Sequence, residues 1–225
     1  MRNIWLPLLS AIGLFAQDKP AADLRTEKTQ TIEFVSGGLL RMKNSTGMLT
    51  IEAWDKPAVE LTTIKSARTM LPAKERAKAT AQLDQTAFTT ERHGNELDIA
   101  TAVPKHARDI EISYHLWVPR DTRLAIDHAS GEVNIEGVAA DIEATLSRGE
   151  IFLYLPDDAA YSAKAKSGIG GINLPGDPEL RPLHLHLGHS IAQEGGGKTH
   201  ILDLKVGYGD IYVMRQTGMP KRVTE

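Results

Sequence analysis

LAIDHASGEVNIEGVAADIEATLSRGEIFLYLP, residues 124–156, contains two copies of one pattern. In each copy apolar residues alternate with polar ones, a short turn contains a glycine, and the alternation then resumes. Alternate side chains of a strand point to the same face, and glycine readily takes the positive φ that a turn between strands often needs. We therefore predict strand–turn–strand copies whose alternate side chains build one shared apolar interior.

The same pattern recurs along the chain. The further copies are LLRMKNSTGMLTI (39–51), YSAKAKSGIGGINL (161–174) and LDLKVGYGDIYV (202–213). The turn glycines of the later copies are Gly131, Gly149, Gly170 and Gly209. The last interval is close to two periods, so we expect a degenerate copy at LHLHLGHSI (183–191), with Ser190 at the glycine position. A period near 20 residues is typical of solenoids, in which each copy buries its apolar face against its neighbours.

These observations predict an all-β chain: a β-solenoid, similar to a parallel β-helix, with an inserted β-hairpin or sheet and one short helix. The helix is expected within 72–86, where helix formers are frequent, and the hairpin around His93–Asn95. In the copy at 142–155 the expected inward residues are Ile142, Ala144, Leu146, Ile151, Leu153 and Leu155. The expected outward residues are Glu143, Thr145, Glu150, Phe152 and Tyr154.

The domain boundaries follow from this pattern. We expect a signal peptide at 1–16, a linker at 17–30, one solenoid-like domain at 31–214 and a tail at 215–225. Within the domain, 59–118 would form the hairpin or cap region and 119–214 the repeat stack. A stacked repeat needs its open ends covered, because exposed strand edges invite aggregation.

The first sixteen residues indicate export. Arg2 gives a positive start, and the apolar run from Ile4 to Phe15 is too short to span a bilayer comfortably. We expect cleavage after Ala16, a periplasmic or secreted location, and no membrane span in the mature protein. The chain has no cysteine, which excludes disulfides, thiolate metal sites and a lipid-attachment cysteine.

The net charge of −3 argues against a polyanionic partner. Nucleic acid binding depends on clustered lysines and arginines, and the sequence has no basic stretch longer than a few residues. We therefore do not expect a nucleic acid partner. The composition, 41% hydrophobic and 24% charged, is that of an ordinary folded domain.

The sequence also resembles a large bacterial group of adhesin-like domains of unknown function. The group has an early Asn-x-x-Gly strand pair ending near a Trp, a strand ending in Val-Pro, and repeated Ser-Gly turns. The residues at these places are Asn44, Gly47, Trp54, Val118, Pro119, Ser130 and Gly131. The resemblance extends over about 31–213 and implies an exported or envelope-associated β-domain with no catalytic residues to transfer. The Ser-Gly pattern is blurred at Arg148 and at Gly207–Tyr208.

Three aromatic residues are the candidate binding site. Phe152, Tyr154 and Tyr212 should point outward, and Phe152 and Tyr212 occupy the same position of the repeat. Exposed aromatic side chains aligned on one face could contact sugar rings or a partner protein. The alternative is that the hairpin region or the 72–86 helix covers them.

Histidines offer a weaker candidate for a metal site. His184 and His186 would share the outer face of one strand about 7 Å apart, and His200 could join them from another copy. Two imidazoles without a nearby carboxylate bind a metal poorly, so solvated histidines are the competing interpretation. We expect no cofactor.

No residues form a recognisable catalytic pattern. Ser130, Ser147 and Ser167 lie beside turn glycines, where turn chemistry explains them, and no Gly-x-Ser-x-Gly motif is present. We therefore predict a non-enzymatic binding or scaffolding protein of the envelope, whose partner is an envelope or extracellular protein or a polysaccharide. Two alternatives stay open: a β-helix enzyme acting on polysaccharides through scattered carboxylates, and an accessory protein of envelope-stress signalling.

Overall fold

The protein is nearly all β-structure, as a computed structural model shows. The structure describes residues 25–67, 71–104, 107, 110–175, 187–193 and 199–216. Thirteen strands form one mixed sheet, accompanied by one helix within these residues. The all-β prediction with one short helix is thus confirmed.

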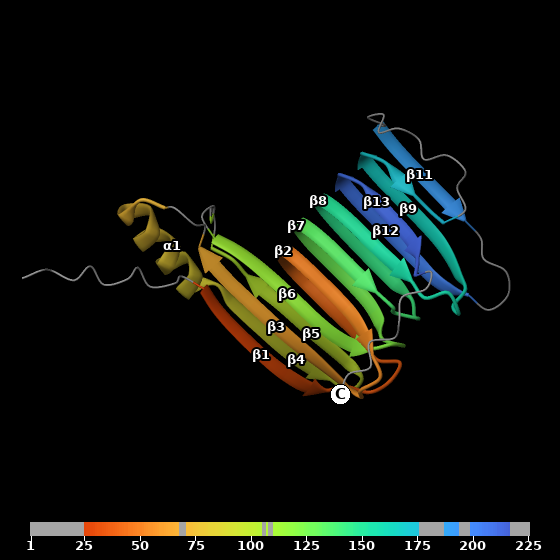
Figure 1. The fold of residues 1–225 in the computed structure, drawn as a ribbon, viewed down its shortest axis with the longest axis horizontal. Coiled ribbons are helices and arrows are strands. Elements are labelled where there is room, and N and C mark those ends of the chain that lie inside the picture. Colours follow the sequence, from red (N-terminus) through yellow and green to blue (C-terminus); the bar gives the residue numbers. More distant parts are fainter. Residues whose placement is uncertain are drawn as a thin grey trace, which may run out of the picture.

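The strands lie side by side along the molecule (Figure 1). Those of the first half are β1 (Arg25–Glu33), β2 (Leu39–Trp54), β3 (Ala58–Ala67), β4 (Ala87–His93), β5 (Glu96–Ala102) and β6 (Ile110–Pro119). Those of the second half are β7 (Arg123–Glu136), β8 (Ile142–Leu155), β9 (Tyr161–Ile169), β10 (Ile172–Asn173), β11 (Leu187–Gln193), β12 (His200–Tyr208) and β13 (Ile211–Arg215). β4 and β5 form the antiparallel hairpin expected around Gly94.

Strands β2, β7 and β8 pair in parallel along most of their length. Leu124 of β7 pairs with Ile142, and Glu136 pairs with Tyr154, although only residues 137–141 separate the two strands. A parallel connection this short requires each strand to turn back on itself. The sheet is therefore folded into two layers that share these three strands.

Glycines form the fold line between the layers. Gly131 and Gly149 have φ values of 131° and 129° and are in register with each other. A Cβ atom on Gly149 would overlap the carbonyl oxygen of Gly131, and a Cβ atom on Gly131 would overlap that of Gly47. Positive φ and this close backbone approach together explain why glycine recurs at the turn of each copy.

Each layer has its own set of neighbours. The first layer contains β4, β5, the first halves of β2, β7 and β8, and then β12, β9 and β11. The second layer contains β1, β3, β6, the second halves of β2, β7 and β8, and then β13 and β10. The inserted hairpin therefore extends the first layer, and β6 and β3 extend the second.

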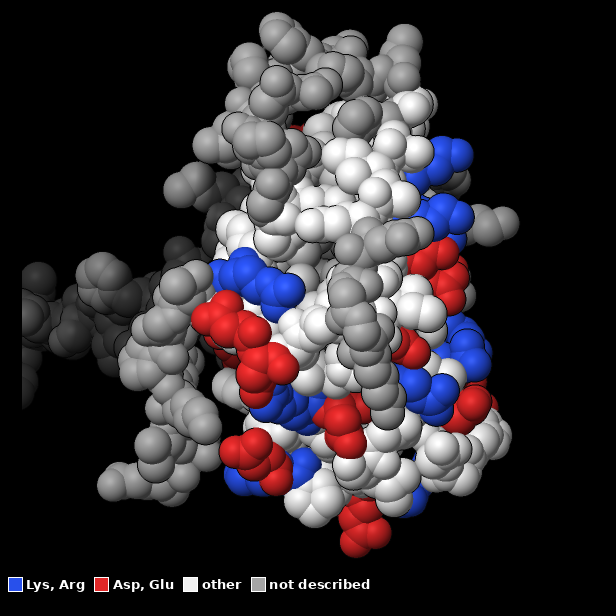
Figure 2. Space-filling view, turned by 90° about the vertical axis from the view of Figure 1, so that its right-hand side faces the viewer, with Lys and Arg blue, Asp and Glu red and all other residues white. Residues whose placement is uncertain are grey.

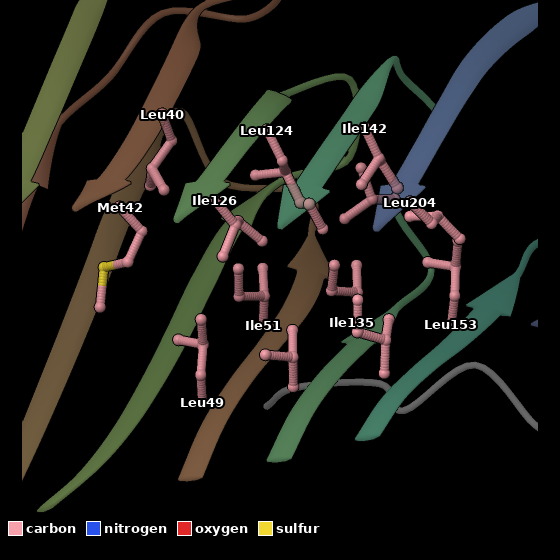
Figure 3. Close-up of a cluster of buried hydrophobic side chains, with 14 of the residues drawn as sticks. Leu40, Met42, Leu49, Ile51, Leu124, Ile126, Ile135, Ile142, Leu153 and Leu204 are labelled. Atoms are coloured by element: carbon pink, nitrogen blue, oxygen red, sulfur yellow. The ribbon is translucent and has the colours of Figure 1, made fainter. Parts of the chain in front are cut away.

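The core lies between the two layers (Figure 3). Leu124 and Ile126 of the first layer point toward Ile51 and Ile135 of the second, and all four are at most 3% exposed. The six residues predicted to point inward from β8 are all buried, and the five predicted to point outward are not. Burial of an aliphatic side chain contributes about 1.5–3 kcal/mol, so neighbouring copies stabilise each other.

The helix α1 (Ala73–Gln85) packs against β3 and β6 at one end of the molecule, the left-hand end in Figure 1. Ala79 and Leu83 are its buried contacts. Lys65 of β3 donates hydrogen bonds to the carbonyl oxygens of Leu83 and Thr86, which satisfies acceptors that the helix end leaves unpaired. Among the described residues, α1 is the only helix, and it is neither long enough nor apolar enough to cross a membrane.

The spatial order of the last copies does not follow their order in the sequence. The final copy, β12 with β13, lies between β8 and the copy formed by β9 and β10. The copy expected at 183–191 is wrong in its described part, because β11 pairs antiparallel with β9. Alternation predicts which side of a strand is buried, but it contains no information about which strand lies next to it. The sheet of the structure contains both parallel and antiparallel pairs.

Candidate binding face

The three aromatic residues predicted as a site lie together on the outside of the second layer. Phe152 of β8 pairs with Tyr212 of β13, and their rings stack with centroids 5.0 Å apart and planes 8° apart. Tyr154 lies two residues further along β8. All three side chains are half-buried.

Neither the hairpin nor the helix covers these rings. The hairpin joins the first layer through β5, on the opposite side of the core, and α1 contacts β3 and β6 rather than β8 or β13. Tyr212 donates a hydrogen bond to Asp210, at 3.2 Å. Partial burial, together with the neighbouring Asp210 carboxylate, raises the pKa of Tyr212, so the phenol stays neutral.

A second aromatic group lies on the same face, on β2 and β6, and β7 separates it from β8. Trp117 of β6 stacks with Trp54 of β2 at 6.0 Å between ring centroids, and His115 lies 5.2 Å from Trp117. His115 Nε2 is 2.7 Å from a carboxylate oxygen of Glu52. Lys56 lies 4.7 Å above the ring of Trp54, whose indole N–H donates to the carbonyl of Ala58.

Sequence reasoning missed this second group as a site. The alternation in ISYHLWVP already indicated that Ser113, His115 and Trp117 share one face. What it could not indicate is that β6 pairs with the second half of β2, which places Trp117 beside Glu52.

Carboxylates surround the aromatic residues. We use the name outer face for the outward positions of the part of β6 that pairs with β2 (Ser113–Pro119), of the second halves of β2, β7 and β8, and of β13 with the preceding residue. The carboxylates on it are Glu52, Glu132, Glu136, Glu150 and Asp210. All positions of the outer face are described, and none is lysine or arginine.

Some of these carboxylates are held by neutral donors. Asn134 donates to Glu132 at 2.6 Å, and Gln216 donates to Glu136 at 2.7 Å. The backbone N–H of Gly171 donates to Asp210 at 2.6 Å. These hydrogen bonds orient the carboxylates without neutralising their charge, so the face stays acidic.

Ser45 and His128 form a pair that resembles a nucleophile and its base. Ser45 Oγ is 2.6 Å from His128 Nδ1, and His128 Nε2 is 2.9 Å from the carbonyl oxygen of Gly47. A carbonyl only accepts, so Nε2 carries the proton and Nδ1 accepts from the serine hydroxyl. Both side chains are fully buried, and burial lowers the pKa of His128. No substrate can reach this pair, and its role is structural.

The remaining sequence candidates contribute less. His184 and His186 lie outside the described residues. Within the described part of the chain, no three His, Asp or Glu side chains gather in a way that could hold a metal ion. Ser167 is buried and donates to the carbonyl of Gly209, as its place beside the turn suggests.

The fold is similar to a solved structure. A "putative cell adhesion protein" from Clostridium sporogenes aligns over 85% of this chain and 100% of its own, with a TM-score of 0.53 and 14% sequence identity. At that identity the likeness concerns the fold alone.

Two more distant structures also align. "Putative adhesins" from Bacteroides fragilis and Parabacteroides merdae each cover 84% of this chain, at 8% and 5% identity and TM-scores of 0.28 and 0.26. No protein-family model and no curated protein matches the sequence.

Proposed function

We propose that the protein is an exported, adhesin-like binding protein without enzymatic activity, and that the outer face is its contact surface. The observation that carries this proposal is that every strand of the outer face, from β6 to β13, bears aromatic or acidic side chains on its outside. Phe152, Tyr154 and Tyr212 are its aromatic residues at one end, and Trp117 is at the other. The similar fold of a protein described as a "putative cell adhesion protein" supports the proposal.

The proposed framework is a solenoid-like stack of bent copies. β2, β7 and β8 each contribute one copy, and β12 with β13 and β9 with β10 contribute two more. Stacked copies of this kind present broad, rigid surfaces. A rigid surface binds without losing much conformational entropy, which suits a protein that contacts an extended partner.

Export is the second part of the proposal, and it rests on the sequence of residues 1–16. Fractionating cells that express the full chain tests it. We expect the mature protein in the periplasm or medium, shortened after Ala16, as mass spectrometry of its N-terminus would show. Leu8→Arg with Leu9→Arg should keep the chain in the cytoplasm, and an unprocessed wild-type chain there would refute export.

The contact surface is tested by adhesion of protein-coated beads to wells coated with peptidoglycan, collagen or neutral polysaccharide. Trp117→Ser combined with Tyr212→Ser should reduce adhesion to whichever coating binds. The matched control is Tyr208→Ser, because Tyr208 is the most exposed tyrosine and belongs to the first layer. Equal adhesion by the double variant and the control would show that the outer face is not the contact surface.

The enzymatic alternative has its own test. Ser45 and His128 are inaccessible, and the carboxylates of the outer face lie on a sheet surface. Incubation with the same polysaccharides should therefore release no soluble product. Product release that disappears with Glu132→Gln or Glu150→Gln would replace the binding proposal with an enzyme.

A further inference from the structure

The ring geometry of the outer face limits what can bind there. Phe152 and Tyr212 lie on neighbouring strands with almost parallel planes, so each ring covers one face of the other. Trp117 and Trp54 stack in the same manner, with planes 25° apart. These rings therefore present mainly their edges to a partner. A pyranose ring that binds an aromatic side chain needs the aromatic face, so this geometry disfavours sugar stacking.

The carboxylates lie in two rows that are offset from each other across the sheet, the first on β7, β8 and β13 and the second on β2 and β7. Glu132, Glu150 and Asp210 are in register on three neighbouring strands, and Glu52 and Glu136 are in register four residues further along. A strand rises about 3.3 Å per residue, so the two rows are about 13 Å apart. Like charges on neighbouring strands destabilise a sheet. On the outer face, the outward positions of these strands hold no lysine or arginine to compensate them, and only Glu52 has a histidine, His115, beside it.

From these observations we propose that the outer face binds a lysine- and arginine-rich polypeptide segment. The inference rests on the proposed binding function and specifies its partner. A basic segment that crosses the strands at the level of Phe152 and Tyr212 has the first acidic row on one side over β7, β8 and β13, and the second acidic row on its other side over β2 and β7. The aliphatic stems of its lysines pack on the ring edges while the ammonium groups reach the carboxylates.

Charge complementarity selects this partner over the other polymers of an envelope. An anionic polysaccharide or nucleic acid would be repelled by five carboxylates that have no lysine or arginine among them. A neutral polysaccharide would gain nothing from their charge. The positive charges of a basic segment offset the repulsion between the carboxylates of each row. The complementary electrostatic potential also accelerates the association of the segment with the face.

Binding of a fluorescent oligolysine peptide to the intact protein, followed by anisotropy, tests the proposal. The test variant combines Glu132→Gln, Glu136→Gln and Glu150→Gln. The matched control combines Asp127→Asn, Glu143→Gln and Asp203→Asn on the outside of the first layer, which changes the net charge equally. We expect the test variant to bind about tenfold more weakly and the control within twofold of wild type, with affinity falling as salt rises.

Several outcomes overturn the proposal. Equal weakening by both triple variants would show attraction to net charge alone, and absence of oligolysine binding would exclude a basic partner. Binding of a neutral glucan that requires Tyr212 would make a polysaccharide the partner. A chain ended after Gln216 that binds oligolysine much more tightly would identify Lys221 and Arg222 of this chain as the occupant. Circular dichroism melting of each variant shows whether it is folded.

The bead assay separates failure of this inference from failure of the proposed function. If bead adhesion depends on Trp117 and Tyr212 while oligolysine does not bind, the binding function stands and the partner chemistry is wrong. If oligolysine binding depends on the three glutamates while the beads adhere without Trp117 and Tyr212, the basic partner stands and the adhesive role of the face is wrong.

Discussion

The outsides of the two layers differ, although the same strands β2, β7 and β8 build both. On the first layer, lysines and arginines alternate with carboxylates and pair with them. Its ion pairs are Arg41 with Glu96 and Asp98, Lys43 with Asp98, and Lys205 with Asp203. Figure 2 views the end of the molecule near β11, where residues of both charges lie next to each other. The outer face of the second layer has carboxylates and aromatic rings instead.

This difference shows what the fold requires and what it leaves free. The buried residues are aliphatic in both layers, because both contribute to one core. The outward positions make no such contribution, so their composition can differ between the layers without changing the backbone. The acidic rows of the outer face, which have no lysine or arginine partner, are therefore a feature that folding alone does not explain.

The largest effect is expected where the two layers meet. Gly149→Ala would place a Cβ atom on the carbonyl oxygen of Gly131 and would also strain a φ of 129°. We expect a loss of more than about 4 kcal/mol in the free energy of unfolding, and disruption of both layers. Gly94→Ala is the control, since its φ is 64° but no atom lies within 4 Å of the added Cβ; it should cost about 1 kcal/mol. Urea unfolding measures both, and equal costs would show that close backbone approach is unimportant.

A slightly smaller effect is expected from a charge in the core. Ile151→Asp buries an unpaired carboxylate and should cost about 4 kcal/mol, and Leu204→Asp in the first layer should cost the same. Glu150→Gln, at the neighbouring outward position, should change stability by less than about 0.5 kcal/mol. Thermal melting distinguishes the three variants, and similar melting temperatures would refute the inside and outside assignment.

The sequence predicted these inward and outward positions correctly because alternation is a local property. It also placed Phe152 and Tyr212 at equivalent positions, and the structure pairs them. It did not predict that β12 lies between β8 and β9, because strand order depends on pairing between residues that are distant in the sequence. For the same reason it missed the contacts of Trp117 with Trp54 and of His115 with Glu52.

An intermediate effect, dependent on pH, is expected from His128. Burial holds its pKa below the ordinary value of 6.5. The unfolded chain therefore takes up a proton near pH 6.5 that the folded protein excludes. The free energy of unfolding should fall as the pH drops below 6.5, by up to about 1.4 kcal/mol per pH unit until His128 protonates in the folded protein.

Urea unfolding of wild type and His128→Gln between pH 5 and 8 isolates this contribution. The variant loses the hydrogen bonds to Ser45 and Gly47, so it should be less stable at pH 8. Its stability should then decline less steeply toward acid than that of wild type. Parallel pH profiles would show that the pKa of His128 is the same in the folded and unfolded states.

The stacked rings should contribute a smaller amount. Phe152→Ala removes the contact with Tyr212 and should cost about 1–2 kcal/mol, since an aromatic pair adds about 0.5–1.5 kcal/mol to the effect of lost burial. Tyr208→Ala on the first layer removes an exposed ring and should cost less than about 0.5 kcal/mol. Chemical unfolding of the two variants compares them. If Phe152→Ala leaves the free energy of unfolding unchanged, the stacked rings contribute to binding and not to stability.

The smallest effect on stability is expected from removing surface charges, and its sign should differ between the outsides of the two layers. Glu132→Gln and Glu150→Gln together relieve repulsion along an acidic row, so they should leave stability unchanged or raise it by about 0.5 kcal/mol. Lys43→Gln on the first layer breaks its pair with Asp98 and should lower stability by about 0.2–1 kcal/mol. Melting at low salt measures both, because salt screens these charges. If both changes destabilise equally, the acidic rows are part of the folding interactions, and the case for a basic partner loses its physical basis.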